Sequence, residues 1–235
     1  MTTFPRSPKL LKGALVRLGE GFLGPIPNII VFQYNPEKFT RTLNSAKTGK
    51  GEKEIAAKAD VPTTTMPFDP GESFSLTLEL DATDALENPF SHPVAMLTGI
   101  ADRIAAIEML LYPTGSDMIS KAISQLTGTT EEVPKNKVPV VLFIWGPGRI
   151  LPVRLKEFSI EEQAFSPTLF PLMAKVSIGM EVLTENSFPV TKNTIPPMNE
   201  QLAVAAYRYT KGLKEGLARA NLLNSAESIL GMLPF

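Results

Sequence analysis

The 235-residue chain contains no cysteine and only one histidine, His92. The missing cysteine excludes disulfides and thiolate metal ligands, and a single histidine excludes a histidine-rich zinc site. A Ser-His-Asp triad could draw only on His92, which directly precedes a predicted helix, where a loop or capping role is far more common than catalysis. We therefore expect no metal site, no cofactor and no catalytic histidine.

Neither sign of charge dominates, because 23 lysines and arginines stand against 24 aspartates and glutamates, a formal net charge of -1. Such a balance gives no global field that would recruit nucleic acid or an anionic membrane. Long apolar runs are missing too, since no stretch approaches the ~18 to 20 consecutive apolar residues that cross a bilayer. Lys12 and Arg17 interrupt the apolar pieces near the N-terminus, so we expect a cytoplasmic protein without an export signal or membrane insertion.

Motifs that would mark an enzyme are scarce as well. Glu161 and Glu162 are adjacent in an extended segment, where neighbouring side chains point to opposite faces, so they do not form a paired acid and base. The Gly146-Pro147-Gly148 sequence lacks the spacing of a phosphate-binding loop, and its proline removes an amide donor. The sequence predicts a protein that is not an enzyme.

What the chain has in quantity is apolar residues, which make up 43% of it and allow a substantial core. Residues 140–145 form a nearly uninterrupted β-branched and aromatic run, which favours a strand. Residues 146–148 break this run, and apolar residues return at 150–155 with Arg154 among them. The pattern predicts a β-hairpin whose first strand is buried on both faces and whose second strand reaches solvent on one.

Strand patterns recur on both sides of this hairpin. Phe74, Leu76, Leu78 and Leu80 alternate with polar residues, which places one face of that strand in the core. Further strands are predicted at residues 13–18, 29–34, 39–43 and 174–182. The chain is therefore predicted to be mainly β (α+β), with one β domain over residues 1–190.

Two segments have the period of a helix. Apolar residues at intervals of three and four predict one amphipathic helix over residues 93–111 that lies against the sheet. These residues are Leu97, Ile100, Ile104, Ile107 and Leu111. Residues 191–235 are predicted to be a proline-rich linker and a helical tail, with the helix at 200–230. The residues at helical spacing in this tail are Leu202, Ala206, Tyr209, Leu213, Leu217 and Ala220. A lone helix is marginal in water, so the tail needs a surface on which to dock.

Two segments are candidates for contact with other chains. Residues 44–60 are lysine-rich without an apolar period, which predicts a solvated arm. Its charges serve solvation more often than binding, and it lacks the interleaved aromatics of a nucleic-acid platform. The second candidate is the helical tail. The predicted assembly-interface residues are Arg41, Lys47, Lys50, Lys53 and Lys58 in and near the arm, and Tyr207, Tyr209, Leu213 and Leu217 in the tail.

The order of these elements resembles the contractile injection system tube protein family. Two short motifs carry the resemblance most specifically, F-Q-Y-N-P at residues 32–36 and F-x-W-G at residues 143–146. The resemblance covers residues 15–184 and implies a tail-tube-like antiparallel β-barrel or sandwich with one flanking helix, here followed by the C-terminal helical tail.

The resemblance also implies a function. Such a chain would be a tube initiator or baseplate adapter in a phage-tail-like particle, joining the central spike to the inner tube. Its implied partners are further copies in a homo-oligomeric ring, commonly a hexamer, together with inner tube subunits, the spike or hub protein and baseplate wedge proteins. The alternative is a monomeric β-rich domain that binds a small ligand or a glycan.

Overall fold

The structure is a computed structural model of the chain, and it describes residues 11–18, 28–44, 69–87, 90–112, 139–188 and 196–230. Seven antiparallel strands form one sheet with the spatial order β2-β1-β5-β6-β7-β4-β3. The strands are β1 (Ala14–Leu18), β2 (Asn28–Val31), β3 (Phe39–Asn44), β4 (Gly71–Asp81), β5 (Val140–Ile144), β6 (Ile150–Phe165) and β7 (Pro171–Val182). The described chain is therefore mainly β, as its sequence patterns predict.

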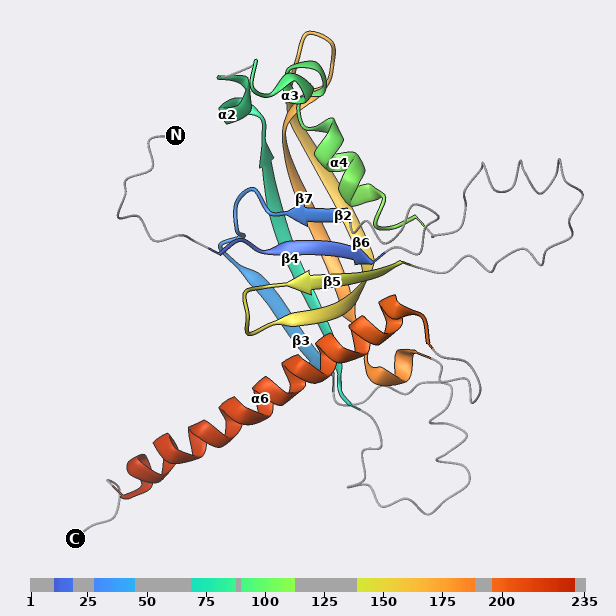
Figure 1. Ribbon diagram of the computed structural model, residues 1–235. Helices are drawn as coiled ribbons and strands as arrows, with labels where there is room; N and C mark the ends of the chain where they lie inside the picture. The colour runs from blue at the N-terminus through green and yellow to red at the C-terminus, as the bar shows by residue number, and fades with distance from the viewer. Residues whose placement is uncertain are drawn as a thin grey trace, which may run out of the picture.

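The long strand β6 divides the sheet into two layers. Its first residues, from Ile150 to Val153, pair with β5, and from Val153 onward it pairs with β7. The register shifts between Leu155 and Glu157, and a bulge of this kind bends a strand and increases its twist. As a result, β2, β1 and β5 run across β7, β4 and β3, as Figure 1 shows.

The core between these layers is aromatic at its centre. Phe32, Phe74 and Phe143 are almost fully buried, and Phe39 and Trp145 pack against them. The contacting ring pairs have centroids 5.2 to 6.4 Å apart, mostly in tilted or edge-on arrangements. Such pairs contribute about 0.5–1.5 kcal/mol each beyond the burial of their area. The core therefore depends on a few large rings.

The predicted hairpin is confirmed as β5 and the first part of β6. Gly146 has a φ of +65° in its turn, and Trp145 donates its backbone N–H to the Arg149 carbonyl at 2.8 Å. β5 is buried or half-buried along its length, whereas β6 exposes Arg154 and Lys156. The alternating strand around Phe74 to Leu80 is confirmed in the same way, because β4 buries Phe74, Leu76, Leu78 and Leu80.

The prediction of a single helix over residues 93–111 is wrong. The chain instead forms α3 (Pro93–Thr98) and α4 (Ala101–Glu108), after a short α2 (Thr83–Leu86). Of the predicted stripe, Ile104 and Ile107 are buried on α4, but Leu97 on α3 is exposed. The apolar period therefore runs across a break in the helix.

Gly99 makes this break. Its φ of +59° and ψ of -117° form a conformation that L side chains rarely adopt. A Cβ at this position would collide with the carbonyl oxygen of Pro171, and that same oxygen accepts the Ile100 N–H at 3.0 Å. The start of β7 thus takes a hydrogen bond that a continuous helix would need for itself.

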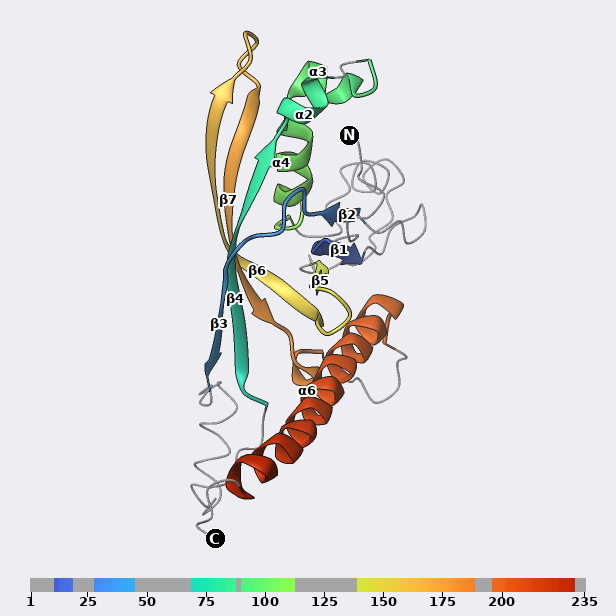
Figure 2. The same cartoon turned by 90° about the vertical axis from the view of Figure 1, so that its left-hand side faces the viewer.

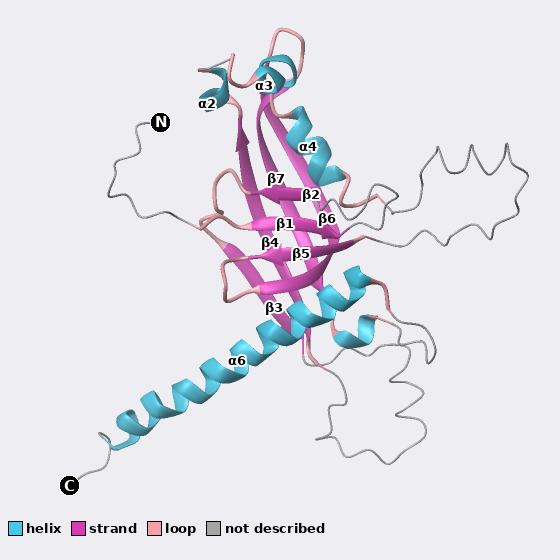
Figure 3. Cartoon of the chain, viewed as in Figure 1, coloured by secondary structure: helices cyan, strands magenta, loops and turns pink. Residues whose placement is uncertain are grey.

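α6 (Met198–Leu230) confirms the predicted helical tail. At 1.5 Å per residue it is about 50 Å long. It crosses the lower end of the strands, and its second half extends beyond them (Figures 1 and 3). The predicted apolar stripe is not the docked one, because Ala203, Tyr207 and Thr210 are buried while Tyr209 and Leu217 are exposed. The docked face includes two hydroxyl groups, which an apolar period does not reveal.

Some predictions lie outside the described residues. These are the arm beyond Asn44, with Lys47, Lys50, Lys53 and Lys58.

In the described part of the chain no helix is long and apolar enough to span a bilayer. The sheet of the described residues is not closed into a barrel, because its outermost strands β2 and β3 each pair with one neighbour only. The described strands alone therefore do not form the closed barrel that the resemblance implies.

Candidate assembly surfaces

The F-Q-Y-N-P segment fixes the end of β2 to the strands beside it. Phe32 donates its backbone N–H to the Gly13 carbonyl at 2.9 Å, and a Cβ on Gly13 would lie 2.6 Å from the Phe32 ring. Asn35 extends the pairing of β1 and β2 with its side chain. Its Oδ1 accepts the Gly13 N–H and its Nδ2 donates to the Leu11 carbonyl, both at 2.8 Å. These two residues of the motif stabilise the fold.

Gln33 makes a similar connection to β4. Its Nε2 donates to the Asp81 carbonyl at 2.8 Å and its Oε1 accepts the Asp81 N–H at 3.0 Å, so the side-chain amide pairs with the strand as a peptide group would. Arg103 on α4 donates to the same Gln33 oxygen at 2.6 Å and to the Asp81 carbonyl at 3.1 Å. A cleft of about 690 Å³ lies beside these groups, between β2 and the helices.

The F-x-W-G motif belongs to the aromatic core and its edge. Phe143 is fully buried, and Gly146 turns the chain toward Arg149. The guanidinium of Arg149 lies 5.0 Å from the centre of the Phe39 ring and 5.5 Å from that of Phe74, within the range of a cation–π interaction. Burial, and then the charge of Arg41, lower the pKa of Arg149. Arg149, three residues after the motif, thus places a cation against the rings of the core.

The sheet has a bare face, which is the outer face of β6, β7, β4 and β3. No described helix covers it, as the edge-on view in Figure 2 shows. Its side chains are polar or charged: the hydroxyls of Thr77 and Ser177 lie 3.2 Å apart on neighbouring strands, and Lys175 lies 4.0 Å from Glu79. The outer edge of β3 and the 154–165 part of β6 have no partner strand on their second side within the described residues. Unpaired strand edges of this kind can pair with another chain.

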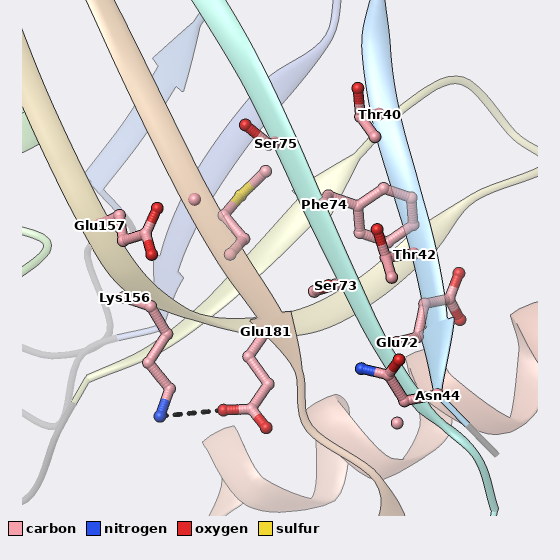
Figure 4. Close-up of a pocket in the computed structure, with 13 residues that line it drawn as sticks. Thr40, Thr42, Asn44, Glu72, Ser73, Phe74, Ser75, Lys156, Glu157 and Glu181 are labelled. Carbon is pink, nitrogen blue, oxygen red and sulfur yellow. Dashed lines mark ion pairs between the residues drawn. The ribbon is translucent and has the colours of Figure 1, made fainter. Parts of the chain in front are cut away.

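A shallow hollow of about 290 Å³ lies on this face (Figure 4). Thr42, Ser73 and Ser75 are among its lining residues, and Lys156 forms an ion pair with Glu181 at 3.0 Å. The described residues contain no group of three acidic or histidine side chains placed to hold a metal ion. Hydroxyls and one ion pair suit this hollow to polar contacts.

α6 is held to the sheet by cations three residues apart. Arg208 donates two hydrogen bonds to the carboxylate of Glu185, at 3.0 and 2.8 Å. Lys211 contacts both oxygens of Asp69 at 2.9 Å, and the Tyr207 hydroxyl donates to the same carboxylate at 2.9 Å. The Lys211 ammonium, with help from Tyr207, lowers the pKa of Asp69, and burial raises the pKa of Tyr207. This side of the docking surface is a charged hydrogen-bond network.

Glu72 forms the inner end of this row. The residue is only 5% exposed, and its carboxylate accepts hydrogen bonds from Lys214 on α6 at 2.7 Å and from Arg41 on β3. The negative charge of Glu72 also raises the pKa of Arg149, which partly offsets the lowering by burial. One buried carboxylate therefore connects β4, β3 and α6.

Hydroxyl groups complete the docking of α6 on the hairpin. Thr210 donates to the Ile150 carbonyl at 2.7 Å and accepts the Ile150 N–H at 3.1 Å. Tyr209 donates to the Pro147 carbonyl at 3.0 Å. These hydrogen bonds, the ion pairs and the buried residues that dock α6 all lie within residues 203–214.

The side chains described in the second half of α6 are mostly solvent-exposed. Leu217 is 72% exposed and directly follows Gly216, and Leu222 is also exposed. Since α6 extends beyond the strands here (Figure 3), this half is free to contact another chain.

Two groups of exposed apolar residues lie at the opposite pole of the sheet, one at and near α3 and one at the turn between β6 and β7, and Figure 2 shows these two elements apart from each other. Together these residues are called the apolar end. Leu169, at the turn, is 79% exposed and has a φ of +64°, a strained conformation for a leucine. Ser166 closes this turn through a 2.8 Å bond from its N–H to the Phe170 carbonyl. The exposed apolar residues of this end are Phe90, Val94, Met96, Leu97, Phe165, Leu169, Phe170 and Met173.

The predicted interface residues are thus placed in different ways. Arg41 contacts Glu72, Tyr207 is buried against the same chain, and Tyr209 bonds the hairpin turn. Leu213 is half-buried and Leu217 is exposed. Sequence analysis missed Glu72 and the apolar end, because the partners of Glu72 are distant in sequence and the exposed residues of α3 look like core residues.

Comparison of the chain with models of known protein families gave no match, and comparison with curated proteins gave none either.

Proposed function

We propose that this chain is a structural subunit of a contractile injection system or contractile phage tail. In this role it forms a ring at the baseplate, joins the central spike to the inner tube and nucleates tube assembly. The order of strands and the F-Q-Y-N-P and F-x-W-G motifs support the proposal through the family resemblance. It is a structural role and includes no catalysis.

The observation that carries the proposal is the pair of unpaired edges on one sheet. β3 ends the sheet on one side, and the 154–165 part of β6 has a second edge without a partner among the described residues. If β3 of one copy pairs with this part of β6 in the next, backbone hydrogen bonds continue the sheet from copy to copy. Around a closed ring this arrangement makes a barrel that no single copy contains.

The other surfaces fit contacts along the axis of such a ring. The bare polar face in Figure 2 would line the channel, since its threonines and serines favour water. The apolar end and the exposed half of α6 lie at opposite poles of the subunit, where they would meet the inner tube on one side and the spike on the other. The particle would form in the cytoplasm.

The alternative function is ligand or glycan binding by a monomer. The 690 Å³ cleft beside β2 and the 290 Å³ hollow on the bare face favour it, because both include polar groups among their lining residues. Carbohydrates require hydroxyl, amide and carboxylate partners of this type.

Sedimentation of the purified chain, alone and with the tube and spike proteins of its particle, separates the two functions. We expect a closed oligomer, or oligomerisation upon addition of either partner. If the chain stays a monomer and binds neither partner, the proposed ring is wrong.

A truncation tests the contribution of α6. A chain ending at Glu215 keeps the docking contacts of Arg208, Lys211 and Lys214 but lacks the exposed half. We expect it to fold with unchanged thermal stability and to assemble poorly. The full-length variant Leu217→Ala retains the helix and removes one predicted interface side chain, so it should impair assembly less than the truncation does. Normal particles from the truncated chain would remove this half of α6 from the assembly mechanism.

A further inference from the structure

The free edge of β2 forms one wall of the 690 Å³ cleft. Phe32 donates its N–H to the carbonyl of Gly13, the residue before β1, and backbone groups of alternate residues in an antiparallel strand point the same way. Ile30 therefore faces β1, while the N–H and C=O groups of Ile29 and Val31 point away from it. No described strand pairs with that edge.

The side chains of the same two residues are apolar and exposed, Ile29 by 56% and Val31 by 55%. On the other face of the strand, Phe32 is buried, and Ala106 and Ile107 of α4 line the cleft beside it. A strand added to this edge would place alternate side chains on these two apolar surfaces. A groove between a free strand edge and a helix is a recurring site for extended peptides.

Within the described residues, the charged side chains that line the cleft form no ion pairs. Lys12 donates to the Gln33 carbonyl at 3.0 Å, and Arg103 is bonded to neutral oxygens of Gln33 and Asp81. Asp84 accepts only the Tyr34 hydroxyl, at 3.3 Å, and among the described residues no cation pairs with it.

Asp102 lines the same cleft from α4 and likewise has no cation partner in the described part of the chain. The two carboxylates, Asp84 and Asp102, therefore favour a ligand that brings a positive charge.

We propose that this cleft binds an extended, mainly apolar peptide segment with a basic residue, which joins the sheet as an additional strand beside β2. The apolar side chains of the peptide lie against Ile29, Val31 and Ala106, and its basic residue lies near Asp84 and Asp102. The inference does not depend on the ring, because the edges assigned to ring contacts belong to β3 and β6.

The test measures fluorescence anisotropy of a labelled hexapeptide, Arg-Val-Thr-Val-Ile-Thr, titrated with the full chain. We expect saturable binding. A twin peptide with N-methyl groups on two adjacent central residues cannot pair through either edge, and we expect it to bind at least tenfold more weakly. A second twin with Glu in place of Arg should also lose at least tenfold, because it meets the two carboxylates.

A protein variant tests the same edge. Val31→Pro removes an N–H that points away from β1 and leaves the β1 pairing of Ile30 in place, as proline permits at a strand edge. We expect binding to fall at least tenfold while the circular dichroism spectrum and thermal midpoint stay close to those of the wild type. Asp84→Asn with Asp102→Asn should remove the preference for Arg over Glu and keep the dependence on peptide N–H groups.

Three results would overturn the proposal. The first is the absence of saturable binding, and the second is equal binding of the N-methylated twin. The third is a dimer of the chain that Val31→Pro dissociates, because this would assign the edge to a second copy. If Val31→Pro fails to fold, the two peptide twins decide the question with the unmodified protein.

Discussion

The aromatic core and the docking surface of α6 are built from opposite chemistry. Phe32, Phe74 and Phe143 exclude water between two layers of strands. Among the described side chains of α6 only Ala203, Tyr207 and Thr210 are buried, and the other docking contacts are ion pairs and hydroxyl bonds. Apolar packing depends little on pH or salt, whereas charged contacts depend on both. The β fold and the attachment of α6 should therefore respond to different perturbations.

The largest effect is expected in the core. Phe143→Ala removes a fully buried ring that stacks on Trp145 and contacts Phe74, and a cavity of this size costs about 3–5 kcal/mol of unfolding free energy. Urea denaturation followed by circular dichroism measures the loss. The matched control is Phe90→Ala, since Phe90 is 99% exposed, and its effect should stay within about 0.5 kcal/mol. Equal effects of the two substitutions would contradict this account of the core.

A smaller effect is expected at Glu72. Glu72→Gln leaves Lys214 and Arg41 without their shared carboxylate at a buried site, and we expect a loss of about 2 kcal/mol, less than for a fully buried pair because both cations reach solvent. Hydrogen exchange should show the loss of protection in residues 203–214 before the strands. Glu79→Gln is the control, because Glu79 is exposed and 4.0 Å from Lys175. Uniform deprotection of α6 and the strands would show that α6 does not open separately.

The strands were predictable because their residues show the alternation directly. β4 buries every second residue from Phe74 to Leu80, and the turn at Gly146 is marked by the glycines themselves. The break at Gly99 was not predictable. Its cause is the Pro171 carbonyl, which lies far along the chain and accepts the Ile100 N–H.

The docking surface was hidden for a similar reason. Glu72 and Lys214 are 142 residues apart in sequence, and no local pattern connects them. Of the three residues in this contact, Arg41, Glu72 and Lys214, only Arg41 is among the predicted interface residues. The docked face of α6 includes Tyr207 and Thr210, whose hydroxyls bond Asp69 and Ile150, so an apolar period points to the wrong side of the helix.

The smallest expected effect is a weakening of the α6 attachment in acid. Lys211 lowers the pKa of Asp69 from its ordinary value of 3.8, and Arg208 lowers that of Glu185 from 4.5. Because both pKa values are lower in the folded chain, their contribution is complete above the ordinary values and is lost as pH falls through the lowered ones. The attachment should stay constant from pH 7 to 5 and weaken below about pH 4.

Hydrogen exchange of residues 203–214, corrected for the pH dependence of the intrinsic rate, measures this change. The strands around Phe143 should keep their protection over the same range, because the apolar packing of their buried rings does not titrate. Asp69→Asn is the control: it should lower the protection of α6 at neutral pH and reduce its further loss in acid. If the variant and the wild type lose protection in parallel below pH 4, Asp69 does not hold the helix. The proposed dependence of α6 on charged contacts would then be wrong, whereas the account of the aromatic core would be unaffected.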